Sequence, residues 1–207
     1  MMTLVRLSYR LKAIVDFVGK SATFILIPLV LVTVWDVVAR KLIWIQIFMV
    51  ENFGSIFEST LLQEMEWHLH TALFALAFGY GYTHNRHVRV DFLREKMAFR
   101  RQAWIEFLGC TFFVIPFTMI LAYFAVIYAY DSFMIGEQSA SLVGLSHRWI
   151  IKSVLIFGIM FLFLAALSIW LQFFVVLFGS NKARFELMIL TWPKEVEEAD
   201  GLKQAAE

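Results

Sequence analysis

The chain has 207 residues, of which 60% are hydrophobic and only 17% are charged, and its formal net charge is +1. Soluble domains are about half apolar and about a quarter charged, and 22 Phe and 7 Trp side chains have few ways to avoid water in so short a chain. These values exclude a disordered protein, a nucleic-acid-binding protein and an ordinary soluble enzyme, and they indicate a protein that crosses a membrane several times.

The N-terminal segment has apolar residues at helical spacing, with basic residues between them. The apolar residues are Leu4, Leu7, Leu11, Val15 and Val18. A helix with one apolar and one basic face binds in the interface of a membrane. We therefore expect an amphipathic helix on the inner leaflet, ahead of the first membrane span.

Four stretches are long and apolar enough to cross a bilayer as helices, which takes about 20 mostly apolar residues. Between the first two, the apolar part of Leu42–Phe57 is too short to cross, and we interpret this segment as interfacial at the outer surface. The sequence therefore predicts an all-α membrane protein, with four transmembrane helices in residues 1–180 and a soluble tail in 181–207. The predicted spans are about 17–39, 64–84, 105–130 and 150–178.

The basic residues indicate the orientation of the spans. Most of them lie in the N-terminal tail, in the segment 84–103 and after the last span. Basic residues near the ends of spans stay on the cytoplasmic side. Both termini and the middle loop are therefore predicted to be cytoplasmic. Leu93, Met97 and Trp104 suggest a second amphipathic surface helix ahead of the third span.

Small residues in the spans suggest where helices meet. Ala75 and Gly79, like Ala77 and Gly81, are four apart in the second span, a spacing that lets neighbouring membrane helices approach closely. The single cysteine, Cys110, cannot form an intramolecular disulfide or a CxxC pair. We expect it to pack as a small hydrophobic side chain.

Charged residues occur in two layers, at the outer and inner ends of the spans, and none lies at mid-bilayer. In the inner layer, Asp16 and Lys20 are four apart, in the favourable order for an ion pair within a helix. We interpret most of these charges as groups that pair and fix the depth of the helices. The alternative is that some of them face a partner protein. The outer layer comprises Asp36, Glu64, Glu66, Asp131, Arg148 and Lys152.

An ion pathway needs polar residues nearer the middle of the spans, and no paired carboxylates or Ser-His-Asp set lies at that depth. The chain alone is therefore predicted to be a scaffold that docks onto another protein, and not an enzyme. Two alternatives stay open. A haem-binding electron-transfer subunit would use His68 and His147, which could meet near the outer surface. A small channel would conduct without a partner.

Six short motifs follow one another along the predicted spans and loops, and their order is part of the pattern. Together they closely resemble the small membrane subunit, of the DctQ type, of tripartite ATP-independent periplasmic (TRAP) transporters, over about residues 10–178. The motifs are Leu62–Leu69, Gly81–Tyr82, His87–Asp91, Arg100–Trp104, Gly136–Ser139 and His147–Ser153.

The resemblance implies a multi-pass subunit of the bacterial inner membrane that works with two partners. In that family a periplasmic binding protein (DctP-type) captures the substrate, usually an organic acid. A large membrane subunit (DctM-type) carries it inward, driven by a sodium gradient. The small subunit packs against the large one and braces it among the membrane lipids. Sodium ions are expected in the large subunit, and no cofactor, metal or nucleic acid is expected on this chain.

The resemblance also implies roles for charged and aromatic residues in these motifs, which open the second span, form an inner-loop signature and form an outer-loop signature. We expect them, together with Asp36 and Glu64, to hold loops and helix ends in place or to face the partner, and not to bind substrate. In chain order they are Glu66, Trp67, His87, Arg89, Asp91, Glu137, Arg148, Trp149 and Lys152.

One stretch departs from the family pattern. Ser141-Leu142-Val143 stands where relatives tend to have an Asp-Pro-Gly-like turn. The outer loop is therefore expected to differ in shape from that of relatives. For this reason the resemblance does not imply a contact between this loop and the binding protein.

Overall fold

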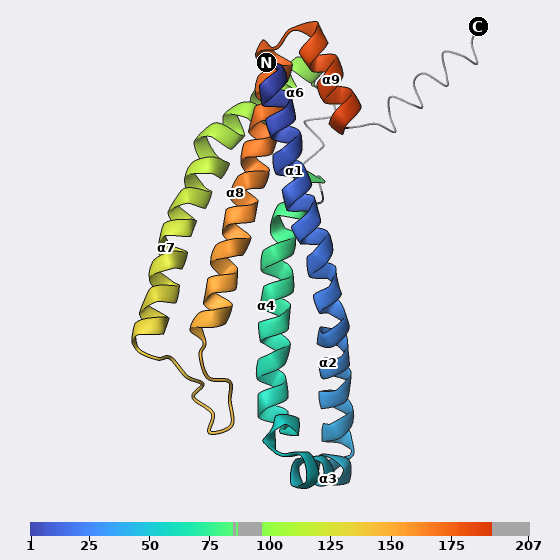
Figure 1. The fold of residues 1–207 in the computed structure, drawn as a ribbon, viewed down its shortest axis with the longest axis vertical. Coiled ribbons are helices and arrows are strands. Elements are labelled where there is room, and N and C mark those ends of the chain that lie inside the picture. Colours follow the sequence, from blue (N-terminus) through green and yellow to red (C-terminus); the bar gives the residue numbers. More distant parts are fainter. Residues whose placement is uncertain (85, 87–96, 192–207) are drawn as a thin grey trace, which may run out of the picture.

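The structure is a computed structural model that describes residues 1–84, 86 and 97–191. These residues form helices and no strand, in agreement with the predicted all-α class (Figure 1). The helices are α1 (Met2–Ala22), α2 (Leu26–Lys41), α3 (Ile43–Phe53), α4 (Ser59–Thr83), α6 (Phe99–Gly109), α7 (Ile115–Met134), α8 (Trp149–Phe178) and α9 (Asn181–Thr191).

The N-terminal helix is longer than predicted. Helices α1 and α2 continue into one another through a 3₁₀ turn at Thr23–Ile25, and form one rod from Met2 to Lys41. Pro28 follows this turn and has no N–H to donate to the carbonyl four residues earlier, which explains the tighter turn. The helix therefore has no break near residue 17, where the predicted surface helix ends and the first span begins, and the start of that span stays a prediction. Val5 and Val15 are buried in the bundle.

Within residues 1–84, 86 and 97–191, three helical stretches are long and apolar enough to cross a membrane: Met2–Lys41, Phe99–Met134 and Trp149–Phe178. They correspond to the first, third and fourth predicted spans. The second predicted span corresponds to α4, which has 25 residues and a length of about 37 Å. Its outer half carries glutamate and histidine side chains, so it is less apolar than the others, and four spans stay a prediction.

Helix α3 lies across the ends of α2 and α4, roughly at right angles to them (Figure 1). Its 11 residues reach only about 16 Å, which is too short to cross a bilayer and agrees with the interpretation of Leu42–Phe57. Ile43, Trp44, Ile47 and Phe48 are all more than half exposed. The helix therefore presents apolar side chains at one end of the bundle.

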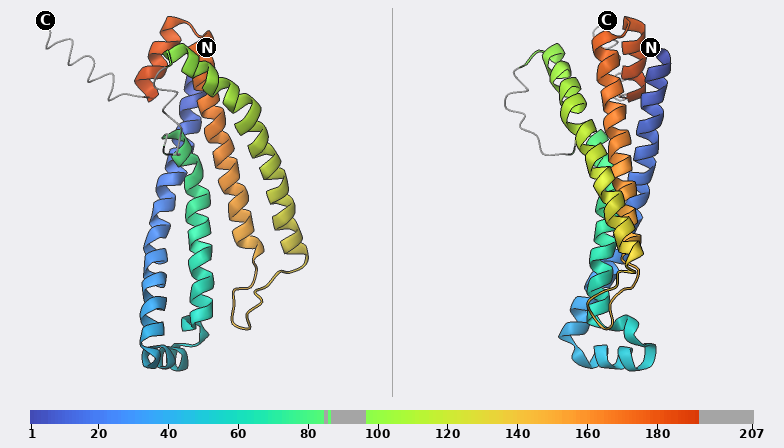
Figure 2. Two further views of the ribbon diagram at one scale, coloured as in Figure 1. Left: turned by 180° about the vertical axis from the view of Figure 1, so that it is seen from behind. Right: turned by 90° about the vertical axis from the view of Figure 1, so that its left-hand side faces the viewer.

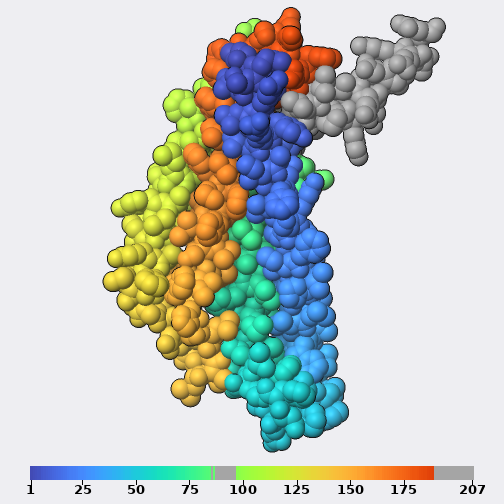
Figure 3. Space-filling view, viewed as in Figure 1, coloured from blue at the N-terminus to red at the C-terminus, as the bar shows by residue number. Residues whose placement is uncertain are grey.

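Helices α4 and α8 form the central contact. Helix α4 lies between α2 and α8, and α7 lies on the far side of α8 (Figures 1 and 3). A Cβ atom on Gly158 would lie 2.6 Å from the Ala75 carbonyl oxygen, and one on Gly79 would lie 2.7 Å from the Phe161 carbonyl oxygen. The two backbones thus touch where only small residues fit, which confirms the contact expected at Ala75 and Gly79. Gly81, in the second predicted pair, is half-buried.

The end of the bundle that is predicted to be cytoplasmic is built on α1, α8 and α9. Val5, Val175, Ala183 and Leu187 form a buried apolar cluster, and the Ser168 hydroxyl donates a hydrogen bond of 2.9 Å to the backbone carbonyl of Ser8. The first part of the predicted soluble tail, 181–191, therefore packs against the membrane helices.

A turn of π-helix at Cys110–Val114 joins α6 to α7, so Trp104 belongs to a helix continuous with the third predicted span. Pro116 follows this turn and removes a backbone donor, which is a common cause of such irregularity. Cys110 is buried, as expected, and its Sγ lies 3.3 Å from the Tyr82 hydroxyl. Leu93, from the predicted surface helix, lies outside the described residues.

Candidate functional site

At the other end of the bundle, predicted to be the outer one, polar contacts join α4 to α8 through the loop between α7 and α8. The Glu64 carboxylate on α4 accepts hydrogen bonds from the Ser139 hydroxyl, from the Leu145 backbone N–H at 2.5 Å and from the Arg148 guanidinium at 3.2 Å. Glu64 and Arg148 are both largely buried. A single carboxylate on α4 therefore fixes three points of the loop.

A second ion pair joins the same loop to α8. Lys152 donates a hydrogen bond to the Glu137 carboxylate, and its Nζ lies 3.7 Å from the centre of the Tyr128 ring on α7. The hydrogen bond from Lys152 holds the pKa of Glu137 below its usual range. The Arg148 backbone N–H also donates to the Glu137 carbonyl at 3.2 Å. We call Glu64, Ser139, Arg148, Glu137 and Lys152 the outer clamp.

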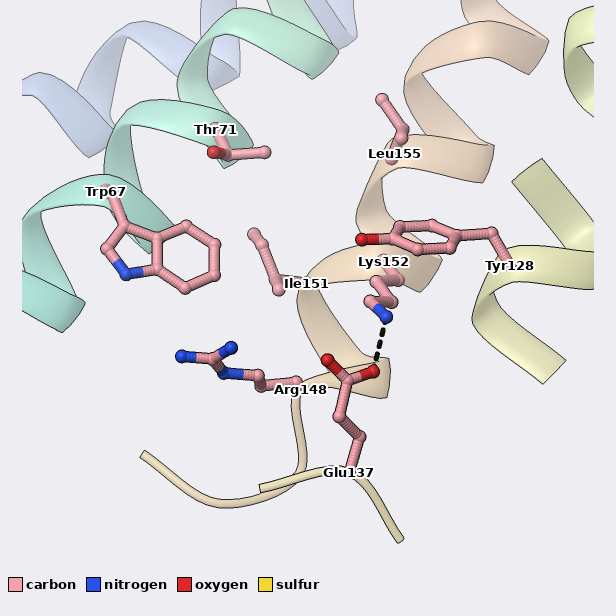
Figure 4. A pocket seen from close by; sticks show the side chains of 8 residues that line it. All are labelled: Trp67, Thr71, Tyr128, Glu137, Arg148, Ile151, Lys152 and Leu155. Carbon is pink, nitrogen blue, oxygen red and sulfur yellow. Dashed lines mark hydrogen bonds and ion pairs between the residues drawn. The ribbon is translucent and has the colours of Figure 1, made fainter. Parts of the chain in front are cut away.

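The outer clamp borders a cavity of about 250 Å³ (Figure 4). Arg148 lies over the Trp67 ring, 5.7 Å from its centre, while Glu137 and Lys152 face each other from the loop and α8. Each of the two carboxylates has a cation from the same chain as its partner, so the arrangement is suited to holding a loop in place. The lining residues are Trp67, Thr71, Tyr128, Glu137, Arg148, Ile151, Lys152 and Leu155.

Asp36 lies apart from the clamp, at the contact between α2 and α4. Its side chain is wholly buried, pairs with Arg40 one turn later on α2, and accepts a hydrogen bond of 2.7 Å from the Ser59 hydroxyl at the start of α4. A buried charge is tolerated only when it is paired. The bond from Ser59 to Asp36 therefore holds the first turn of α4 beside the end of α2.

Glu66 and Trp149 also lie outside the clamp. Glu66 lines a second cavity, of about 300 Å³, between α2 and α4. Its Oε1 atom is buried and has no hydrogen-bond partner among the described residues. Trp149 begins α8 and packs edge-on against Phe133 of α7, with ring centres 5.4 Å apart. The expected inner-loop residues His87, Arg89 and Asp91 lie outside the described residues.

The inner-layer acid makes a contact that differs from the expected one. Asp16 accepts a hydrogen bond of 3.1 Å from the Thr83 hydroxyl and lies 3.5 Å from the His84 ring nitrogen, at the end of α4. The structure has no ion pair between Asp16 and Lys20, because the carboxylate turns towards α4 instead of along its own helix. Asp16 thus ties α1 to α4, as Asp36 ties α2 to α4.

Sequence reasoning missed Ser139 and Tyr128. Ser139 lies in the Gly136–Ser139 motif identified in the sequence. Nothing in that motif indicates that its hydroxyl donates a hydrogen bond to Glu64. Tyr128 lies on another helix from its partner Lys152, and nothing in the local sequence pairs them. The two histidines of the haem hypothesis have separate contacts: His68 Nδ1 lies 2.6 Å from the Glu64 carbonyl, and the exposed His147 contacts the Ser146 hydroxyl.

In the described part of the chain, no group of three or more His, Cys, Asp or Glu residues is placed to hold a metal ion, and the haem hypothesis has no support. No curated protein and no solved structure matches the chain significantly. The model of one protein family, described as the DctQ component of tripartite ATP-independent periplasmic transporters, matches residues 29–175. That family is a transporter component and not an enzyme family. Since the match covers more than two thirds of the sequence, the chain belongs to the DctQ family of TRAP transporter subunits.

Proposed function

We propose that this chain packs against and braces the large, DctM-type subunit of a sodium-coupled TRAP transporter for an organic acid, and carries no substrate itself. A DctP-type periplasmic binding protein would deliver the acid, and the sodium ions would bind in the large subunit. Membership of the DctQ family supports the assignment to such a complex. The bracing role is argued from the bundle itself.

The observation that carries the proposal is the closed contact between α4 and α8. With Gly158 against Ala75 and Gly79 against Phe161, no side chain of ordinary size fits between the two backbones. The polar side chains buried deeper in α8 bond within the protein, because Ser168 donates to the Ser8 carbonyl and accepts from Gln172. A solute path would need polar groups free to replace its hydration shell.

We further propose a multi-pass topology in the bacterial inner membrane, with four crossings and both termini in the cytoplasm. The crossings are the α1–α2 rod, α4, the α6–α7 rod and α8. The apolar face of α3 would then lie in the outer interface, and the basic side chains Arg6, Arg10, Arg100 and Arg101 would lie on the cytoplasmic side, as the positive-inside rule requires.

Affinity purification from membranes tests the proposal. The tagged chain, produced together with the large subunit of the same transporter, is expected to retain that subunit through detergent extraction. The purified chain alone in planar bilayers is expected to conduct no current. A large subunit that never co-purifies with the intact chain, or a steady conductance from the chain alone, would overturn the proposed role.

A further inference from the structure

The exposed side of α4 differs from the exposed sides of its neighbours. On α2 between Leu26 and Val34, and on α7 between Phe117 and Tyr130, every exposed side chain is aliphatic or aromatic, as a surface facing lipid requires. The outer half of α4 instead presents mostly polar side chains along slightly more than two helical turns. We call this stretch the α4 ridge; it consists of Gln63, Glu66, Trp67, His70 and Thr71.

The α4 ridge stands between two hollows on one side of the molecule. The cavity of about 300 Å³ opens between the ridge and Leu29 and Thr33 of α2. The cavity of about 250 Å³ opens between the ridge and the outer clamp, and Trp67 and Thr71 line both. Seen from behind, α4 lies between α2 and α8 (Figure 2), and Figure 4 shows Trp67 and Thr71 beside the cavity of about 250 Å³.

One atom on the ridge lacks a partner. Glu66 Oε1 is buried and accepts no hydrogen bond from the described residues, whereas Glu64 and Glu137 are each paired with a cation. Glu66 also has no cation partner among the described residues, and a carboxylate beside lipid tails destabilises the protein unless a donor meets it. Lipid tails supply none. The ridge therefore has the chemistry of a surface covered by protein.

We propose that the α4 ridge and its two flanking hollows are the surface on which the large transport subunit docks, with a basic or amide side chain of that subunit meeting Glu66. This inference rests on the proposed function, since it names the face that the bracing uses. Charge complementarity selects the occupant: a second copy of this chain would bring the same acidic ridge against itself. Aromatic or aliphatic side chains of the large subunit would fill the hollows beside Trp67.

Site-specific photo-crosslinking in membranes that contain both subunits tests the docking face. The photoreactive residue p-benzoylphenylalanine, which inserts into nearby C–H bonds, replaces either His70 on the ridge or Leu31 on α2. Leu31 is a matched control because it is 65% exposed and faces lipid in this account. A crosslink to the large subunit is expected from position 70 and not from position 31.

The outcomes separate the inference from the proposed function. Co-purification of the two subunits with a crosslink from position 31 but not from position 70 would overturn the docking face and leave the bracing role intact. A crosslink from position 70 to a second copy of the chain would overturn the choice of occupant. Loss of co-purification with the unaltered chain would contradict the bracing role itself.

A charge reversal tests the part played by Glu66. Glu66→Lys is expected to lower the amount of large subunit recovered per tagged chain by about tenfold or more, because like charges would meet. Glu66→Gln keeps an acceptor oxygen, and most of the large subunit is expected to be recovered with this variant. The control is Glu51→Lys, the same change on exposed α3. Equal recovery with the two lysine variants, at equal membrane levels of the chain, would overturn the pairing.

Discussion

At the scale of single residues, the outer clamp places two carboxylates and two cations around one loop. Glu64 and Arg148 are largely shielded from water, so removing either leaves a charge whose hydrogen bonds are unmade. The loss is about 1–3 kcal/mol for a buried group of this kind. The clamp is therefore expected to contribute to the stability of this end of the bundle.

Charge reversal in the clamp is expected to harm assembly and not substrate recognition. Arg148→Glu or Lys152→Glu places like charges together, so less intact complex should be recovered from membranes. The binding protein's affinity for its organic acid should stay unchanged. Lys41→Glu, an exposed change at the end of α2, is the control. Undiminished assembly together with an altered substrate affinity would assign these residues a ligand role instead.

The pairing of Glu137 predicts a pH dependence. Its pKa is lowered in the folded protein from the ordinary value of 4.5, so the pair contributes stability above that pH and loses it as the pH falls through the lower folded value. The melting temperature of the purified protein should exceed that of Glu137→Gln at neutral pH, and the difference should shrink on acidification. A difference that grows as the pH falls would contradict the pairing.

The two charge layers were predictable from the sequence, because charges avoid the middle of a membrane span. Their partners were not. Glu64 meets Arg148, 84 residues later in the chain, through a loop whose shape depends on α7 and α8 together. Asp16, similarly, turns to Thr83 and not to its neighbour Lys20, since helix packing decides which partner is within reach.

At the scale of elements, the contact between α4 and α8 depends on glycine. Gly158→Ala would place a Cβ 2.6 Å from the Ala75 carbonyl oxygen, and we expect a loss of about 1–3 kcal/mol of stability from overpacking. Gly109→Ala is the control, since no atom lies within 4 Å of a Cβ added there. Thermal unfolding in detergent, followed by size-exclusion chromatography, compares them. Equal melting temperatures would show that the helices do not touch here.

The apolar helices were easier to predict than their ends. The last predicted span, 150–178, nearly coincides with α8, because a long uncharged run specifies a buried helix without further information. The predicted start of the first span, near residue 17, has no counterpart in the structure, where the helix is continuous. Basic residues between the apolar ones suggested a surface helix, whereas α1 runs on into α2 and buries Val5 and Val15 against its neighbours. Amphipathic spacing alone does not distinguish a membrane surface from a protein surface.

At the scale of the whole molecule, the bundle has a closed centre, apolar outer faces on α2 and α7, and a polar ridge on α4. The closed centre supports the proposal that transport occurs in another chain, and the ridge is the face on which that chain is proposed to dock. Helix α3 and the clamp join the ends of the helices at the end of the bundle that is predicted to be the outer one. These features together suit a subunit that stabilises a partner in the bilayer.

Reconstitution of the transporter in proteoliposomes tests this role most directly. Uptake of the organic acid is measured with the binding protein outside and an inward sodium gradient, with the large subunit alone or together with this chain. The account predicts uptake when both membrane subunits are present, little uptake by the large subunit alone, and none by this chain alone. Full uptake by the large subunit without this chain, or uptake by this chain on its own, would contradict it.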